Sequence, residues 1–130
     1  MEIIAAVFAE DIQLRPVPGP ATQIDLTGIQ FSAPAPGVPP VTVGPHLMVL
    51  VWCPSDHGGF GALEVVFTRD GEPEPVARNV QPLQIEPGKF NYRLIRAELS
   101  FPDHGTIVAH CSIDGGPTTR VPYTLLAPAE

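Results

Sequence analysis

Prolines recur along the whole chain, and this feature limits the possible fold more than any other. The sequence holds 17 prolines in 130 residues, well above the usual share of about 5%. Proline is a strong punctuator of local structure. Because the prolines are scattered and not gathered in one tract, they divide the chain into short segments separated by turns.

Most of these segments alternate apolar and polar residues, as strands do. Residues 63–67 and 107–113 carry apolar residues at every second position, and an Asp-Gly turn follows each run. Residues 121–125 continue the alternation, so 107–113 and 121–125 are predicted to form a hairpin. In residues 24–31 the alternation changes phase at Gly28, which predicts a β-bulge there.

One segment, residues 46–53, is apolar on both faces. Met48, Leu50 and Trp52 share one face of the predicted strand, and the residues between them share the other. Such a strand belongs at the centre of a sheet that is covered on both sides. A two-layer sandwich buries only one face of each sheet. The second face must therefore be covered by a connector or by another chain, and an exposed stripe would mark an interface.

Two segments permit two interpretations. Residues 2–14 begin with a β-branched apolar run, but Ile4, Phe8 and Ile12 also recur at the four-residue spacing of a helix. Residues 90–101 contain good helix formers, yet turns flank the segment on both sides. We interpret residues 90–101 as a bulged strand because the alternation shifts phase after Leu94.

The predicted fold is all-β, an antiparallel two-sheet β-sandwich of about seven or eight strands. The length of 130 residues suits a single domain, residues 1–130. Residues 32–45 are a proline-rich connector within this domain. Because proline cannot donate to a sheet ladder, the connector is expected to run as an extended edge or a loop from one sheet to the other.

The charge balance excludes several partners. Fourteen acidic residues oppose seven basic ones, for a net charge of −7, and no basic cluster is present. Binding to nucleic acid or to an anionic membrane is therefore not expected. No apolar run approaches the roughly 20 residues of a membrane helix, and the start lacks the basic residues of a signal peptide. We expect a cytoplasmic protein whose Cys53 and Cys111 are reduced thiols.

Two stretches resemble a widespread family of small uncharacterised bacterial domains. The first consists of "FAEDIQL", a turn and "IDLTGIQF", and the second is "LSFPDHGTIVAHCSIDG". The family pattern is a strand ending in an acidic pair, a turn, a strand with an apolar-Gly-apolar step, and later Phe-Pro, a turn, a strand and Asp-Gly. The resemblance covers about half of the chain and implies an immunoglobulin-like or C2-like sandwich with no known activity. The turn "RPVPGPATQ", residues 15–23, departs from the family's compact turn.

Cysteine and histidine residues raise the question of a metal site or a disulfide. Cys53 and His57 form a C-x3-H unit, and His104, His110 and Cys111 lie downstream; zinc favours such ligands. The paired spacing of structural zinc sites is missing, however, and His110 and Cys111 point to opposite faces of one strand. The tryptophan beside Cys53 invites comparison with disulfide-bridged sandwiches, but buried free thiols fit the expected compartment better.

No catalytic constellation emerges from the sequence. It lacks a G-x-S-x-G nucleophile elbow and a phosphate-binding glycine loop, and no third group orients a cysteine–histidine pair. We therefore expect a non-enzymatic protein with no cofactor, and we assign no catalytic, cofactor-binding or metal-ligating residues. The strand that is apolar on both faces favours a function through protein–protein contacts, as a self-associating structural or assembly component.

The alternative hypothesis is a small metal- or ligand-binding module. Asp-His-Gly occurs twice, at residues 56–58 and 103–105. C2-like domains bind calcium through aspartates in loops at one end, although Asp-x-Gly is also a common turn composition. If the two loops adjoin, the candidate ligands are Asp56, His57, Asp103 and His104.

Overall fold

A computed structural model describes residues 1–16 and 22–127, and these residues form eleven strands and no helix. The strands are β1 (Glu2–Pro16), β2 (Thr22–Gln30), β3 (Ser32–Pro34), β4 (Val41–Val43), β5 (His46–Trp52), β6 (Phe60–Arg69), β7 (Pro75–Gln84), β8 (Phe90–Arg96), β9 (Leu99–Phe101), β10 (Gly105–Ile113) and β11 (Thr119–Leu126). The described part of the chain thus contains no helix that could span a membrane.

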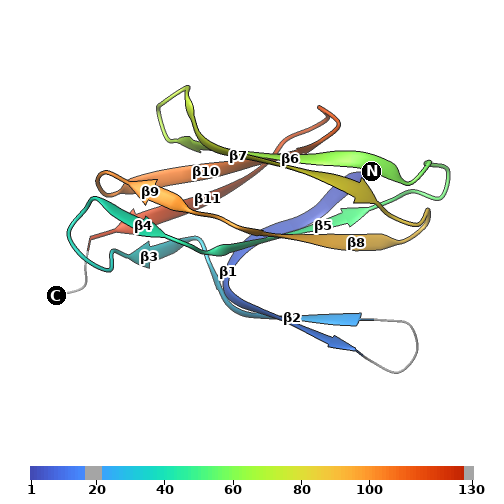
Figure 1. The fold of residues 1–130 in the computed structure, drawn as a ribbon, viewed down its shortest axis with the longest axis horizontal. Coiled ribbons are helices and arrows are strands. Elements are labelled where there is room, and N and C mark those ends of the chain that lie inside the picture. Colours follow the sequence, from blue (N-terminus) through green and yellow to red (C-terminus); the bar gives the residue numbers. More distant parts are fainter. Residues whose placement is uncertain (17–21, 128–130) are drawn as a thin grey trace.

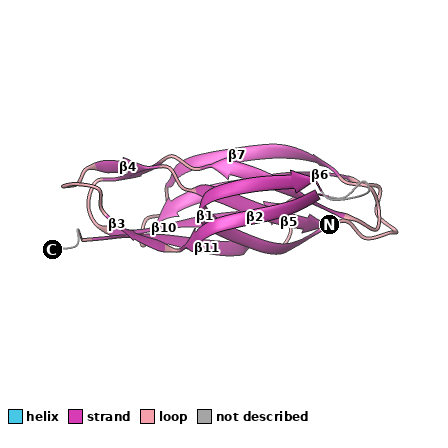
Figure 2. Ribbon diagram, turned by 90° about the horizontal axis from the view of Figure 1, so that it is seen from below, coloured by secondary structure: helices cyan, strands magenta, loops and turns pink. Residues whose placement is uncertain are grey.

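The strands form two larger sheets and one small one (Figure 1). The first sheet has the order β2-β1-β5-β8, the second has the order β3-β11-β10-β6-β7, and β4 pairs with β9. All pairings are antiparallel except that of β3 with β11. The two larger sheets pack face to face (Figure 2). The fold is therefore all-β, with the layers of a β-sandwich.

The core lies between the two larger sheets. Leu47, Val49 and Val51 of β5 are fully buried there. Phe8 of β1 meets Tyr123 of β11 edge to face, with 5.3 Å between the ring centres, a geometry that aromatic pairs favour. The second sheet contributes the alternating residues predicted from the sequence: Leu63, Val65, Phe67, Ile107, Ala109, Cys111, Ile113, Val121 and Leu125.

The predicted C-terminal hairpin is confirmed. β10 and β11 pair in an antiparallel register from Gly105–Leu125 to Cys111–Thr119. The turn between them contains Asp114 at φ 50° and Gly115 at φ 71°, the backbone conformation that Asp-Gly turns supply.

The two ambiguous segments are strands, but residues 90–101 do not form a bulged strand. β8 and β9 belong to different sheets, and β8 pairs with β5 without a register shift. The apparent change of phase has another cause: the outward face of β8 is apolar, whereas its inward face carries Asn91 and Arg93 and becomes apolar only from Ile95 onward. Leu94 lies on one face, and Ile95, Ala97 and the buried residues of β9 continue the other.

Gly28 has the unusual backbone that the phase change predicted, but it is not a bulge. The register of β1 with β2 stays constant on both sides of it. Its φ is +65°, and a side chain there would lie 2.7 Å from a Glu10 carboxylate oxygen. The Glu10 side chain therefore lies across Gly28, in space that only glycine leaves open.

β1 changes partners halfway along its length. Residues from Glu2 to Ala9 pair with β5, and residues from Phe8 to Pro16 pair with β2. The second half of β1 leaves the sandwich together with β2, and we call β1 from Glu10 onward with β2 the arm. Figures 1 and 2 both place the arm over the face of the first sheet that points away from the second sheet. The predicted turn at residues 15–23 falls largely outside the described residues.

The proline-rich connector crosses between the sheets, as predicted. It leaves β2 of the first sheet, adds β3 to the second sheet, forms β4 and enters β5 of the first sheet. β3 and β4 lie at the left end of the molecule in Figure 1, whereas β5 ends toward the right.

Replacing Gly28 by alanine is expected to lower the free energy of unfolding by about 1–2 kcal/mol, because a side chain at positive φ is strained and Glu10 must move. Gly37→Ala is the matched control, since nothing lies within 4 Å of the added carbon, and it should change stability by less than about 0.5 kcal/mol. Urea unfolding measures both variants, and equal effects would contradict this account of Gly28.

Candidate functional site

Hydrogen bonds from its backbone N–H groups hold the loop that follows β5. Cys53 is fully buried in the core, and its N–H donates to the Lys89 carbonyl over 2.9 Å. The Gly59 N–H donates to His57 Nδ1 over 3.0 Å, while the Cys53 sulfur lies 3.8 Å from the same nitrogen. Nδ1 is therefore already an acceptor within the turn, and the Cys53–His57 pair is part of the turn's structure.

The two Asp-His-Gly loops lie at opposite ends of β6. The first loop leads into β6 at Phe60, whereas the second lies beside Asp70, whose N–H donates to the Thr106 carbonyl over 3.0 Å. Ten residues of strand span about 30 Å, and Figure 1 shows the two loops at opposite ends of the molecule.

The expectation that these loops adjoin is therefore wrong. The four candidate ligands form no common site: Asp56, His57, Asp103 and His104. Among residues 1–16 and 22–127, no group of three or more acidic, histidine or cysteine side chains is placed to hold a metal ion. In the second loop, Asp103 accepts the His104 backbone N–H over 2.8 Å, a local bond typical of aspartate turns.

Both cysteines carry free, buried thiols. Burial raises the pKa of the Cys111 thiol to about 11, so at neutral pH this thiol is protonated and a poor nucleophile. Cys111 points into the core while His110 points out of the same strand, as the alternation predicted.

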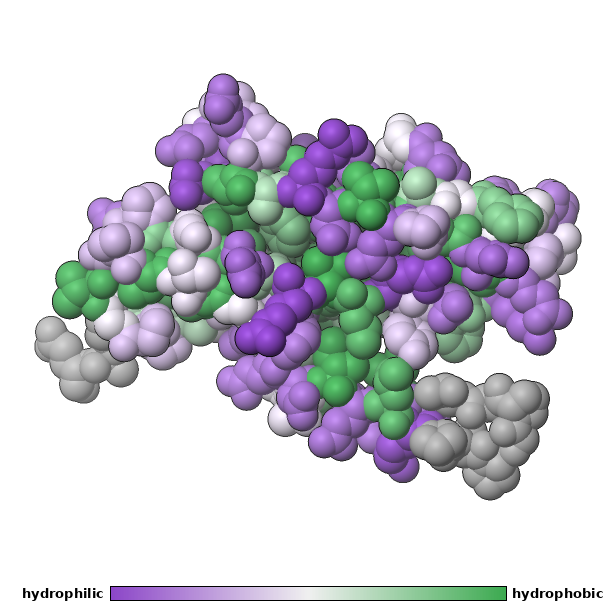
Figure 3. Space-filling model, in the orientation of Figure 1, coloured by the Kyte–Doolittle hydropathy of each residue, from purple (hydrophilic) through white to green (hydrophobic). Residues whose placement is uncertain are grey.

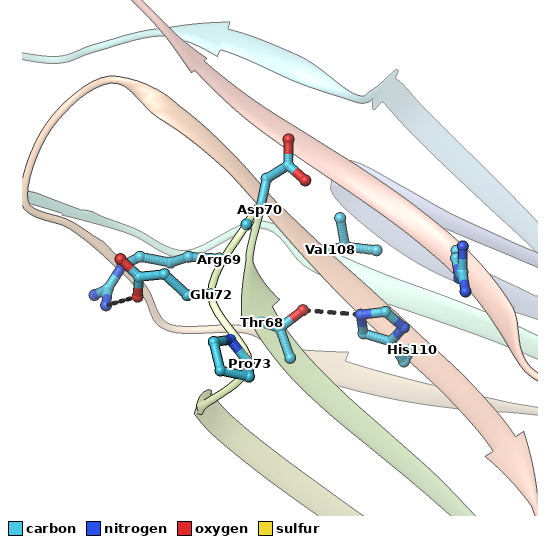
Figure 4. Close-up of a pocket in the computed structure, with 9 residues that line it drawn as sticks. Thr68, Arg69, Asp70, Glu72, Pro73, Val108 and His110 are labelled. Carbon is cyan, nitrogen blue, oxygen red and sulfur yellow. Dashed lines mark hydrogen bonds and ion pairs between the residues drawn. The ribbon is translucent and has the colours of Figure 1, made fainter.

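A hollow on the outer face of the second sheet was not predicted. It has a volume of about 420 Å³ and gathers Thr68 of β6, Glu72 of the following turn, His110 of β10 and Arg120 of β11. The Thr68 hydroxyl and His110 Nε2 are 2.8 Å apart (Figure 4). The cross-strand pairing of these strands could have suggested the cluster, but only once the strand order was known.

This hollow lacks the third member of a catalytic triad. A hydroxyl–imidazole pair needs a group that orients the ring through its other nitrogen. Among the described residues, no carboxylate is hydrogen-bonded to His110 Nδ1, and Asp70 points away from the ring in Figure 4. We therefore assign no catalytic role to it.

The outer face of the first sheet carries a row of apolar side chains outside the core. Three cross-strand pairs of β5 and β8 build it: Met48–Leu94, Leu50–Tyr92 and Trp52–Phe90. These six residues, which we call the apolar outer face, alternate with the core residues of the same strands and so point away from the core. The stripe predicted from residues 46–53 is thus doubled in width by β8.

The apolar outer face is covered at Met48 and open at its Trp52–Phe90 end. Met48 is only 4% exposed although it lies outside the main core cluster, and the arm is the element on that side in Figures 1 and 2. Leu94 is 36% and Phe90 59% exposed. Figure 3 shows apolar side chains gathered between the sandwich and the arm. The arm therefore lies on the side where Met48 is covered, while the cross-strand partner Leu94 stays partly exposed. The sequence had suggested the connector as the cover.

No family model, curated protein or solved structure matches this chain. The resemblance to a bacterial domain family stays a prediction.

Gly59→Ala is expected to destabilise the protein by about 2–3 kcal/mol. Gly59 has φ +90°, and an added carbon would lie 2.6 Å from the Ile85 backbone oxygen. Its neighbour Gly58 provides the control, since nothing lies within 4 Å of its added carbon. Thermal unfolding of both variants measures the difference. If Gly58→Ala proves equally costly, the loop is not held in the way described.

Stability is expected to fall between about pH 9 and pH 11, partly through Cys111. Burial in the folded state raises the pKa of this thiol from 9.0 to about 11. Its contribution to the free energy of unfolding is therefore complete below pH 9 and is lost as the pH rises toward 11. Urea unfolding at pH 8.5 and pH 10.5 measures how far the free energy of unfolding falls, and the fall should be smaller in Cys111→Ala than in the unsubstituted protein. An equal fall in the two proteins would contradict the role of Cys111.

Proposed function

We propose that this protein is a non-enzymatic β-sandwich of the immunoglobulin-like or C2-like type that works through protein–protein contacts. In this proposal it is a cytoplasmic, self-associating assembly component, and the apolar outer face is its contact surface. The observation that carries the proposal is the row of three apolar cross-strand pairs from Met48–Leu94 to Trp52–Phe90, which belongs to neither the core nor a polar surface.

The composition of this face supports a protein partner. Trp52, Tyr92 and Phe90 lie together at its open end, and tryptophan and tyrosine supply many of the energetically dominant contacts of interfaces. Full burial of one large apolar side chain contributes about 1.5–3 kcal/mol. A net charge of −7 opposes long-range attraction between two copies, so a contact between them would depend on short-range apolar burial at this face.

The remaining candidate sites favour this proposal over a catalytic one. The cysteine beside His57 is buried, the Thr68–His110 pair lacks an orienting carboxylate among the described residues, and the Asp-His-Gly loops lie apart. We therefore propose no cofactor, and a second copy of the chain is the proposed partner. The resemblance to small bacterial domains with no known activity is in keeping with this proposal.

Charge on the open end of the face is expected to dissociate the assembly. Phe90→Glu and Trp52→Glu should each shift the protein to a folded monomer, because a carboxylate buried in an apolar contact is strongly disfavoured. Val80→Glu is the control: Val80 is as exposed as Phe90, at 55% against 59%, but lies on β7 of the second sheet. Light scattering coupled to size exclusion measures mass, and circular dichroism verifies folding.

An oligomer that survives both Phe90→Glu and Trp52→Glu while remaining folded would show that the contact lies elsewhere. Dissociation by Val80→Glu as well would show that the effect of charge is unspecific.

A further inference from the structure

The edge strands of the two larger sheets differ in how readily they can pair with another strand. An edge strand offers unpaired backbone groups to other chains, and proteins block this with prolines, charges, short strands or local caps. On β8, the outer edge of the first sheet, the Tyr92 N–H donates to Asn91 Oδ1 over 2.8 Å, and the Tyr92 carbonyl accepts from Arg93 Nη1 over 2.8 Å. Neighbouring side chains thus cap the middle of β8.

The second sheet has hindered edges on both sides. β7 contains Pro75 and Pro82, which have no backbone N–H to donate, and the Pro82 carbonyl accepts from Arg93 Nη2 over 3.2 Å. β3 has only three residues and ends in Pro34. Neither edge offers a continuous ladder to an incoming strand.

The arm has two edges, and only one of them is well suited to pairing. Beyond Ala9, β1 pairs with no strand of the described residues on the side opposite β2. This edge carries the charged residues Glu10, Asp11 and Arg15 and ends in Pro16. Such a density of charge on an edge opposes pairing.

β2 is the edge without these obstacles. It has nine residues, no proline and one charged residue, Asp25. Asp25 forms an ion pair with Arg15 of β1, which lowers the pKa of Asp25 and raises the pKa of Arg15. The single charge of β2 is therefore neutralised within its own hairpin. Among the hydrogen bonds of the described residues, no side chain caps the β2 backbone.

We propose that β2 pairs antiparallel with β2 of a second copy, so that the two first sheets join into one continuous sheet across a two-fold axis. The proposal rests on the self-association proposed above and names its geometry. A head-to-tail contact within these sheets would need β2 to pair with β8, β7, β3 or the charged edge of β1 of the next copy, and those edges are hindered. Like edges are left to pair with each other, which gives a closed dimer and no open filament.

Joining the arms also removes a weakness of the isolated arm. A two-stranded hairpin is marginal by itself, and three or more strands with an apolar face are needed for independent stability. The arm carries two apolar cross-strand pairs on one face, Ile12–Leu26 and Leu14–Ile24. These side chains lie outside the main core cluster, and Leu14 is 45% exposed. Two paired arms form four strands with a continuous apolar face.

A cysteine scan along β2 tests this geometry. Single cysteines are placed in turn at Gln23, Ile24, Asp25, Leu26 and Thr27, before the irregular backbone of Gly28, and the full-length proteins are oxidised gently. Opposed residues of antiparallel strands are close enough for a disulfide. Disulfide-linked dimer should peak at one position, or at two adjoining positions, nearest the two-fold axis and fall on both sides.

Two controls complete the experiment. The unsubstituted protein should give no linked dimer, because Cys53 and Cys111 are buried, and Val80→Cys reports random collisions of an exposed edge residue.

If native mass spectrometry shows an oligomer but no β2 position gives more linked dimer than Val80→Cys, the β2 pairing is overturned while self-association stands. A protein that is monomeric at all concentrations overturns both. A β2 peak that persists with Phe90→Glu supports the pairing and removes the apolar outer face as the contact.

Discussion

The rest of this structure depends on β5, a strand that is apolar on both faces. Its inner residues Leu47, Val49 and Val51 are fully buried against the second sheet. Its outer residues need a second cover, since a two-layer sandwich supplies only one. Met48 is covered on the side of the arm, and the Trp52 end stays open beside the exposed Phe90. The incomplete cover is what points to a partner.

The face and the edge of the first sheet play different parts in the proposed contact. The face supplies apolar area, which is non-directional and fixes no register. The β2 edge supplies backbone hydrogen bonds, which fix direction and symmetry. Because β8 is capped at Tyr92 and β7 carries prolines, the proposed edge contact is restricted to one strand, and the proposed assembly closes at two copies.

Sequence patterns predicted β6, β10 and β11 of the second sheet, because these strands have one apolar and one polar face. Leu63, Val65 and Phe67 of β6 are buried as the alternation required. The same reasoning misjudged residues 90–101, since the outward apolar residues of β8 are followed by the inward apolar residues from Ile95 onward, which imitates a change of phase. It also read Gly28 as a bulge when the glycine makes room for the Glu10 side chain.

Features that depend on strand order were beyond the sequence. The Asp-His-Gly loops look alike, but nothing local records that ten residues of β6 separate them. The Thr68–His110 hollow joins side chains from different strands. The arm arises because β1 exchanges β5 for β2 near Ala9, and a continuous strand pattern over residues 2–16 carries no mark of that exchange.

The most direct test of the central claim is native mass spectrometry of the purified protein without added metal, over a range of concentrations. The account predicts a discrete dimer with no bound adduct, whose population rises with concentration. A monomer at every concentration would contradict it, and a monomer carrying a stoichiometric metal or small molecule would replace it with a ligand-binding function.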